Sequence, residues 1–189
     1  MAELNADFTK VYVDSSETHE TIVVDARTLQ ITKRIQVGKH PAHLTLSPNG
    51  KYLAVMAEDD NAVVFIDTER DEVVKTLPGF HTPHFLRFTP DGRFAYVANI
   101  GAHHLTRVDM TTLEIESHIA LEGFQGRPIE APDEGGFADA QIDKNGILLR
   151  LTTPPGVCWS MTPRRTRGCR RSWLARDRGW SSPSIRSLT

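Results

Sequence analysis

The sequence predicts an all-β fold made of repeated four-stranded antiparallel units, because the same residues recur at a fixed interval. Asp25, Asp67 and Asp109 are equally spaced, and the turn Pro-Asn-Gly at 48–50 returns one interval later as Pro-Asp-Gly at 90–92. Four short strands in a repeat of about 42 residues are typical of one β-propeller blade. An up-and-down sandwich gives no reason for a constant period, so we favour a partial β-propeller of about three blades.

The strand pattern is clearest in the second full repeat, where short apolar runs alternate with turn residues. Strands are expected at 85–88, 94–98, 105–108 and 114–120, with turns at 89–92 and 109–112. Pro-Asp-Gly suits the first turn because proline fixes φ and glycine accepts a positive φ. The three recurring aspartates end strands, so we expect them to form turns rather than to act in catalysis.

A third repeat is predicted to carry an insertion. The next turn sequence, Lys144-Asn145-Gly146, comes later than one interval after its counterpart at 90–92, which implies an insertion of about 12 residues. The stretch Phe124–Gly136 is the expected place, since it is rich in glycine, proline and glutamate. Its acidic residues Glu130, Asp133 and Glu134 form a loop that we expect to be solvated, the alternative being a cover over a site or a contact with a partner.

Several of these motifs resemble the YVTN-type β-propeller repeat. The motifs are Tyr96-Val97-Ala98-Asn99, Val108-Asp109, Val37-Gly38-x-x-Pro41 and Ser47-Pro48-Asn49-Gly50. The group includes the haem-binding propeller of dissimilatory nitrite reductases and, more distantly, lactonase-type propellers. The resemblance covers roughly residues 8–149 and implies a parent of seven or eight blades, so this chain is expected to be truncated. It also implies a periplasmic or extracellular location.

The charge distribution divides the chain after residue 149. Residues 1–149 carry 13 basic and 23 acidic side chains, whereas residues 150–189 carry nine arginines, no lysine and one acidic residue. The cysteines and tryptophans all lie in the second part, at Cys158, Cys169, Trp159, Trp173 and Trp180. We therefore predict a propeller domain at 1–149 and a separate basic tail at 150–189.

The composition of this tail resembles GC-rich DNA read out of frame. In the shifted frame Met161-Thr162 can encode only Asp, and residues 150–163 permit a blade strand that ends in Val-Tyr-Asp. The hypothesis is a frameshifted and truncated propeller. The alternative is a native basic tail that binds nucleic acid or an anionic surface. Because the tail lacks the patterns of nucleic-acid-binding modules, no nucleic-acid partner is expected.

Other classes of protein are excluded by what the sequence lacks. It has no run of 18 apolar residues, so no membrane span is expected, and its first residues do not form a secretory signal. It contains no Cys-x-x-Cys-His, which excludes covalent c-type haem. Phosphate-binding loops and nucleophile elbows are also absent from the sequence.

Seven of the eight histidines are predicted to lie on one face. In a propeller blade, the loop that enters the innermost strand and the loop between the second and third strands share a face. The first kind of loop is expected at 38–43 and 79–84, and the second at 16–19 and 101–104. These segments contain His19, His40, His43, His81, His84, His103 and His104. Only His118 is expected within a strand.

A cluster of imidazoles at a channel mouth indicates a metal, a haem-type group or acid–base chemistry. The candidate metal ligands are His40, His43, His81 and His84. The resemblance implies a prosthetic group over this face, and the candidates to bind it are His81, His84, His103 and His104. Arg87 joins them as a cofactor-binding candidate, because a guanidinium near the channel suits an anionic group. The alternatives are loop histidines that only form hydrogen bonds and an Arg87 that is solvated or in an internal ion pair.

A weaker candidate is the acidic turn on the same face. Glu58, Asp59 and Asp60 could join a divalent cation site, but such a loop is more often a solvated turn.

The function expected from these observations is a binding scaffold. Its His-rich face would hold a haem-like group, a divalent metal or a protein partner. The alternatives are an enzyme, either a nitrite-reductase-like oxidoreductase or a lactonase-like hydrolase, and a cofactor-free interaction module. Because three blades leave sheet faces and edges uncovered, self-association through the unclosed blades is also expected.

Overall fold

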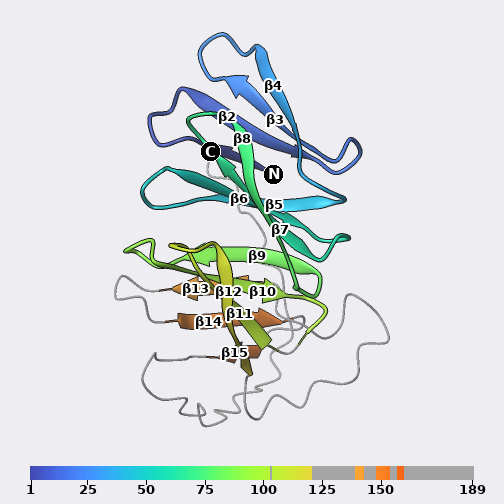
Figure 1. Cartoon of the computed structure of the whole chain (residues 1–189), viewed down its shortest axis with the longest axis vertical. Helices are drawn as coiled ribbons and strands as arrows, with labels where there is room; N and C mark the ends of the chain where they lie inside the picture. Colours follow the sequence, from blue (N-terminus) through green and yellow to red (C-terminus); the bar gives the residue numbers. More distant parts are fainter. Residues whose placement is uncertain (103, 121–138, 143–147, 154–156, 160–189) are drawn as a thin grey trace, which may run out of the picture.

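The computed structural model describes residues 1–102, 104–120, 139–142, 148–153 and 157–159, and within these ranges every regular element is a β-strand (Figure 1). Three four-stranded antiparallel sheets follow one another along the chain. The predicted all-β partial propeller of three blades is therefore confirmed. In this described part no helix is long and apolar enough to cross a membrane.

Each sheet contains four consecutive strands paired with their neighbours in sequence. The first sheet contains β1 (Ala2–Leu4), β2 (Lys10–Ser15), β3 (Glu20–Asp25) and β4 (Ile31–Gln36). The second contains β5 (Pro41–Leu46), β6 (Tyr52–Ala57), β7 (Ala62–Asp67) and β8 (Glu72–Pro78). The third contains β9 (Pro83–Phe88), β10 (Phe94–Asn99), β11 (His104–Asp109) and β12 (Glu114–Ala120).

A further sheet of three strands follows the third blade. It consists of β13 (Asp139–Ile142), β14 (Leu148–Thr153) and β15 (Val157–Trp159), and β13 contacts β9. β14 spans residue 150, where the boundary between propeller and tail is predicted, and that boundary stays a prediction. The insertion at Phe124–Gly136, the turn at 144–146 and residues 160–189 lie outside the described residues.

The recurring aspartates end the third strand of each blade and form the turns that follow. The Asp25 carboxylate accepts hydrogen bonds from the backbone amides of Arg27 and Thr28, and Asp67 accepts the corresponding pair from Glu69 and Arg70. These hydrogen bonds lower the pKa of Asp25 because they stabilise its charged form. The predicted turn-forming role is confirmed.

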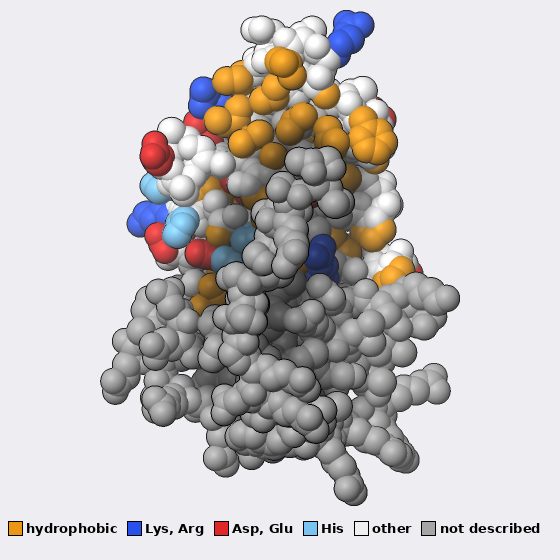
Figure 2. All heavy atoms as spheres, turned by 180° about the vertical axis from the view of Figure 1, so that it is seen from behind, with side chains coloured by type: hydrophobic (Ala, Val, Ile, Leu, Met, Phe, Trp, Pro, Cys, Tyr) orange, Lys and Arg blue, Asp and Glu red, His pale blue; other side chains and the backbone are white. Residues whose placement is uncertain are grey.

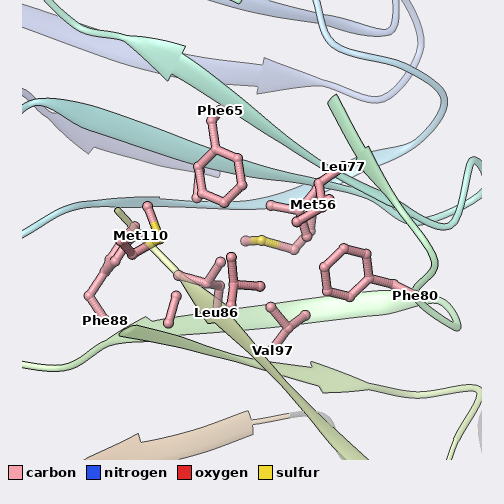
Figure 3. Close-up of a cluster of buried hydrophobic side chains, with 12 residues drawn as sticks. Met56, Phe65, Leu77, Phe80, Leu86, Phe88, Val97 and Met110 are labelled. Carbon is pink, nitrogen blue, oxygen red and sulfur yellow. The ribbon is translucent and has the colours of Figure 1, made fainter. Parts of the chain in front are cut away.

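The sheets are stacked face to face, and their cores lie between them. Between the first two sheets, Tyr12, Val23 and Ile35 meet apolar side chains of β5, β6 and β7. Between the second and third sheets, Phe65 and Met56 meet a second group that includes Leu86 (Figure 3). Each blade thus has two apolar faces, because alternate residues of a strand point to opposite sides.

The first strand of each blade lies next to the first strand of the following blade. β1 contacts β5, β5 contacts β9, and β9 contacts β13. The Thr45 hydroxyl of β5 donates a hydrogen bond of 3.2 Å to the carbonyl of Leu86 in β9. These strands form the innermost layer, so the loops that enter them are brought together at one end.

Candidate functional site

The described histidines of these segments lie at one end of the sheets, and backbone hydrogen bonds link neighbouring segments. His19, His40 and His81 lie in loops. The prediction that only His118 lies within a strand is wrong, because β5, β9 and β11 begin early enough to include His43, His84 and His104. The Val37 amide donates to the His19 carbonyl at 3.1 Å, and the Glu58 amide donates to the His40 carbonyl at 3.2 Å. In the third blade the Gly101 amide donates to the His81 carbonyl at 3.1 Å. We call this face the His-rich rim. Figure 2 shows imidazoles beside acidic side chains at one side of the molecule.

The centre of the rim is a buried carboxylate that contacts two imidazoles. Glu58 follows β6 directly and is only 8% exposed. Its Oε1 forms a short contact with Nδ1 of His84 in β9, and its Oε2 lies 3.8 Å from Nδ1 of His40. A buried carboxylate must be paired or hydrogen-bonded. Glu58 therefore fixes the ring of His84 from the neighbouring blade.

His84 is also held by aromatic neighbours from the innermost strands. The ring of His43 in β5 meets the His84 ring edge to face at 4.4 Å, and meets Phe85 at 5.3 Å. The guanidinium of Arg87 lies over the ring of Phe85, 4.3 Å from its centre. The structure thus brings His43 and Arg87 to the ring of Phe85, with His84 on the other side of His43 in contact with its ring.

The positive charge of Arg87 also acts on the innermost strand of the first blade. Burial raises the pKa of Glu3 in β1, and the positive charge of Arg87 counteracts that rise. The cation therefore lies close enough to the first blade to act on its inner strand. This placement agrees with the expectation of Arg87 near the channel, although a role in cofactor binding stays a prediction.

A second group of imidazoles lies in the third blade. The His81 and His104 rings are 5.6 Å apart, and His104 meets His118 at 4.7 Å. The hydroxyl of buried Thr106 lies 3.1 Å from Nδ1 of His118 and also accepts a hydrogen bond from Asn99. His118 lies near the end of β12 and so reaches the rim, although the sequence pattern separates it from the other histidines.

The predicted ligand sets are divided between these two groups. His40 and His84 contact Glu58 and His43 contacts His84, whereas His81 contacts His104. His103, Glu130, Asp133 and Glu134 lie outside the described residues. Within the ranges that are described, no three His, Cys, Asp or Glu side chains are arranged to hold a metal ion. The binding roles of the candidate residues stay predictions.

Glu58 is the residue whose importance the sequence understates. Its position after a strand suggests a solvated turn with Asp59 and Asp60, and Asp59 does remain exposed, 3.7 Å from His40. The contact of Glu58 with His84 forms only between neighbouring blades, because His84 lies in β9 of the next blade. The sequence feature that could identify Glu58 is its position, because it precedes a turn at the mouth of the channel, next to a loop that carries histidine.

The arrangement leaves one nitrogen of His84 available for chemistry. A carboxylate accepts only, so Nδ1 carries the proton that it shares with Glu58, and in the neutral ring Nε2 keeps its lone pair. A carboxylate on the far nitrogen is the usual device that orients a ligating or catalytic imidazole. The side chain of His84 is 29% exposed, so part of the ring faces solvent at the rim.

The comparisons with known proteins agree with this fold. A family model described as YNCE-like beta-propeller matches residues 2–122. That is more than half of the chain, and the chain belongs to this family of β-propellers.

A curated relative and two solved structures are similar to the chain. The relative is the 6-phosphogluconolactonase of Bacillus subtilis (strain 168), which is 27% identical over 127 residues, covering 59% of this chain and 36% of the relative. One solved structure is the hydrazine synthase of Kuenenia stuttgartiensis, with a TM-score of 0.68, 22% identity and coverage of 82% of this chain and 42% of that chain.

The second solved structure is the dihydro-heme d1 dehydrogenase NirN in complex with DHE. It matches with a TM-score of 0.67 and 16% identity, covering 85% of this chain and 33% of that chain. Both structural matches have low sequence identity and show the fold alone. The chain spans less than half the length of each of these three proteins.

Proposed function

We propose that the chain is a ligand-binding propeller module whose rim binds a haem-type group through His84. The observation that carries the proposal is the contact between His84 Nδ1 and buried Glu58, which leaves Nε2 as the donor atom. A haem-type macrocycle supplies four nitrogens of its own and requires only one axial imidazole. One oriented histidine is therefore sufficient.

The neighbours of His84 also suit such a group. The ring of Phe85 offers a flat apolar surface, and Arg87 beside it offers a cation for a propionate or another anionic substituent. The NirN structure, whose title names a complex with DHE, supports the proposal by its similar fold. When bound, the group would supply redox chemistry. The residues of this chain would bind it and orient it.

An absorbance titration with ferric protoporphyrin IX tests this proposal. The wild-type chain is expected to shift the Soret band, and His84→Ala is expected to weaken the binding. Glu58→Gln should weaken it by about 10–100-fold, the usual effect of removing the partner that orients a ligand. His19→Ala is the matched control, since His19 is an exposed rim histidine that is not among the candidate ligands. Wild-type affinity in His84→Ala would contradict the proposal.

Lactone hydrolysis is the second candidate, favoured by the similarity to the Bacillus subtilis lactonase. Here His84, oriented by Glu58, would act as a general base that takes a proton from water. Arg87 would bind an anionic substituent of the lactone. Acid release from 6-phosphogluconolactone should then exceed the rate in buffer and fall in His84→Ala. A rate equal to that of buffer eliminates this candidate and leaves the first untouched.

A further inference from the structure

We infer that a polar contact between the first and second blades fixes the order in which the blades stack, because only these two blades can complete it. The contact joins two side chains of β2 to the turn that follows β7. Its residues are Lys10, Tyr12, Thr68 and Asp71, and we call it the interblade clasp. The turn after β7 lies at the opposite end of the sheets from the His-rich rim, so the clasp is separate from the candidate site.

The clasp is a set of hydrogen bonds that crosses from one blade to the next. Asp71 accepts a hydrogen bond of 2.7 Å from the Lys10 ammonium and one of 2.6 Å from the Tyr12 hydroxyl. The carbonyl of Thr68 accepts from the same two groups, at 2.9 and 3.2 Å. The side chain of Asp71 is 13% exposed and that of Lys10 is 27% exposed. Because both charges are largely removed from water, each needs the other as its partner.

Tyr12 connects the clasp to the core between the first two sheets. It is 0% exposed and belongs to the hydrophobic cluster of that interface. Burial raises the pKa of its hydroxyl, and the hydrogen bond to Asp71 raises it further. The hydroxyl therefore keeps its proton and remains a donor to the second blade.

The interface between the second and third blades has apolar side chains at the same repeat positions. One interval after the clasp, these positions hold Tyr52, Ala54, Met110 and Leu113. All four belong to, or pack against, the hydrophobic cluster between the second and third sheets, where Figure 3 shows Met110. The backbone of the turn is the same, since φ is 55° at Asp71 and 53° at Leu113. The two interfaces therefore share a geometry and differ in chemistry.

This difference in chemistry penalises incorrect stacking of the blades. Misassembly between similar units is a characteristic failure of repeat proteins, and blades with one strand layout are similar units. If the first sheet stacked on the third, Lys10 would meet Leu113, and Asp71 would be left without its cation. Removing one partner of a buried ion pair is strongly destabilising. The clasp thus acts against the wrong arrangement as well as in favour of the correct one.

Substitutions that imitate the second interface test whether the two charges act as a pair. Lys10→Met and Asp71→Leu each leave one charge without its partner, and each should lower the folding equilibrium constant about tenfold or more in urea titrations. The double variant removes both charges and should recover most of that loss. Leucine suits this backbone, because Leu29 and Leu113 have the same left-handed φ in the other blades. Losses that add in the double variant, or a double variant that does not fold, would overturn the inference.

Zero-length cross-linking with a carbodiimide then shows which sheets are stacked, because this reagent joins a lysine amine to a carboxylate beside it. Lys33 lies 3.7 Å from Glu72 across the first and second blades, and Lys75 lies 2.6 Å from Glu114 across the second and third. After refolding from urea, the wild-type chain is expected to give these two links and no link between Lys33 and Glu114. That last link would report the first sheet stacked on the third.

The double variant separates the order of the blades from their stability. We expect the link between Lys33 and Glu114 to increase about tenfold or more in Lys10→Met/Asp71→Leu, because neither charge now opposes the wrong arrangement. Met110→Ala is the matched control, since it weakens the second interface without changing the clasp, and it should keep the wild-type links. Wild-type links in the double variant would overturn the inference, and so would an equal increase of the Lys33–Glu114 link in Met110→Ala.

Discussion

Replacing Asp14 by asparagine should stabilise the fold at neutral pH. Asp14 points into the interface between the first two sheets, and burial raises the pKa of its carboxyl from 3.8 to about 6, although the Thr21 hydroxyl, which donates a hydrogen bond of 2.6 Å, opposes that rise. Because the pKa of Asp14 is higher in the folded than in the unfolded state, its stabilising contribution is complete below pH 3.8. It is lost as the pH rises through about 6.

The magnitude follows from the difference between the two pKa values. Each pKa unit corresponds to about 1.36 kcal/mol, so ionisation of Asp14 costs about 3 kcal/mol of folding free energy at pH 7 and above. Roughly half of that loss has occurred by pH 5. Asparagine stays neutral and keeps the oxygen that accepts the hydrogen bond from Thr21, so the variant avoids the cost.

Urea unfolding followed by circular dichroism, at intervals from pH 3.5 to pH 8, measures the effect. The free energies of wild type and Asp14→Asn should coincide near pH 3.5 and diverge as the pH rises, with the variant more stable. Asp25→Asn is the control of opposite sign, because hydrogen bonds lower the pKa of Asp25 and the stability that they provide is lost as the pH falls. A difference between wild type and Asp14→Asn that does not change with pH would show that burial does not raise the pKa of Asp14.

Three further substitutions test the packing of the blades, each by urea unfolding. Leu86→Ala empties a fully buried position between the second and third sheets and should cost about 3–5 kcal/mol; a loss below about 1 kcal/mol would mean that these sheets do not pack together. Tyr12→Phe removes the hydroxyl that donates to Asp71 at 2.6 Å across the first two blades and should cost about 1–3 kcal/mol, unless that contact does not form in solution. Gly50→Ala should cost more than Gly92→Ala, since both have a positive φ but only the first would place its methyl 2.6 Å from a side chain; equal losses would place the neighbouring loop elsewhere.

Most of the fold can be predicted from the sequence because each blade of a propeller repeats the same pattern of strands and turns. The constant interval carries the turn-forming Asp25 and Asp67 together with the strands that precede them, and these are local features. Each predicted strand of the third blade agrees with β9 to β12 within a few residues. A periodic pattern also fixes which faces are apolar, so the stacking of blades follows.

The candidate site can be predicted only in part, because its contacts join different blades. Loop positions are sufficient to place the histidines on one rim. The contact between Glu58 and His84 depends on how β6 and β9 are offset across two sheets, and no local pattern encodes that offset. His118 is missed for a related reason, since the length of β12 decides whether its ring reaches His104.

The most direct test of the central claim is chemical rescue of His84→Gly in the presence of ferric protoporphyrin IX. We expect this variant to lose the Soret spectrum of an imidazole-ligated iron and added imidazole to restore it, because the free ring fills the space beside Glu58. A variant that keeps the wild-type spectrum without imidazole would contradict the claim that His84 is the axial ligand.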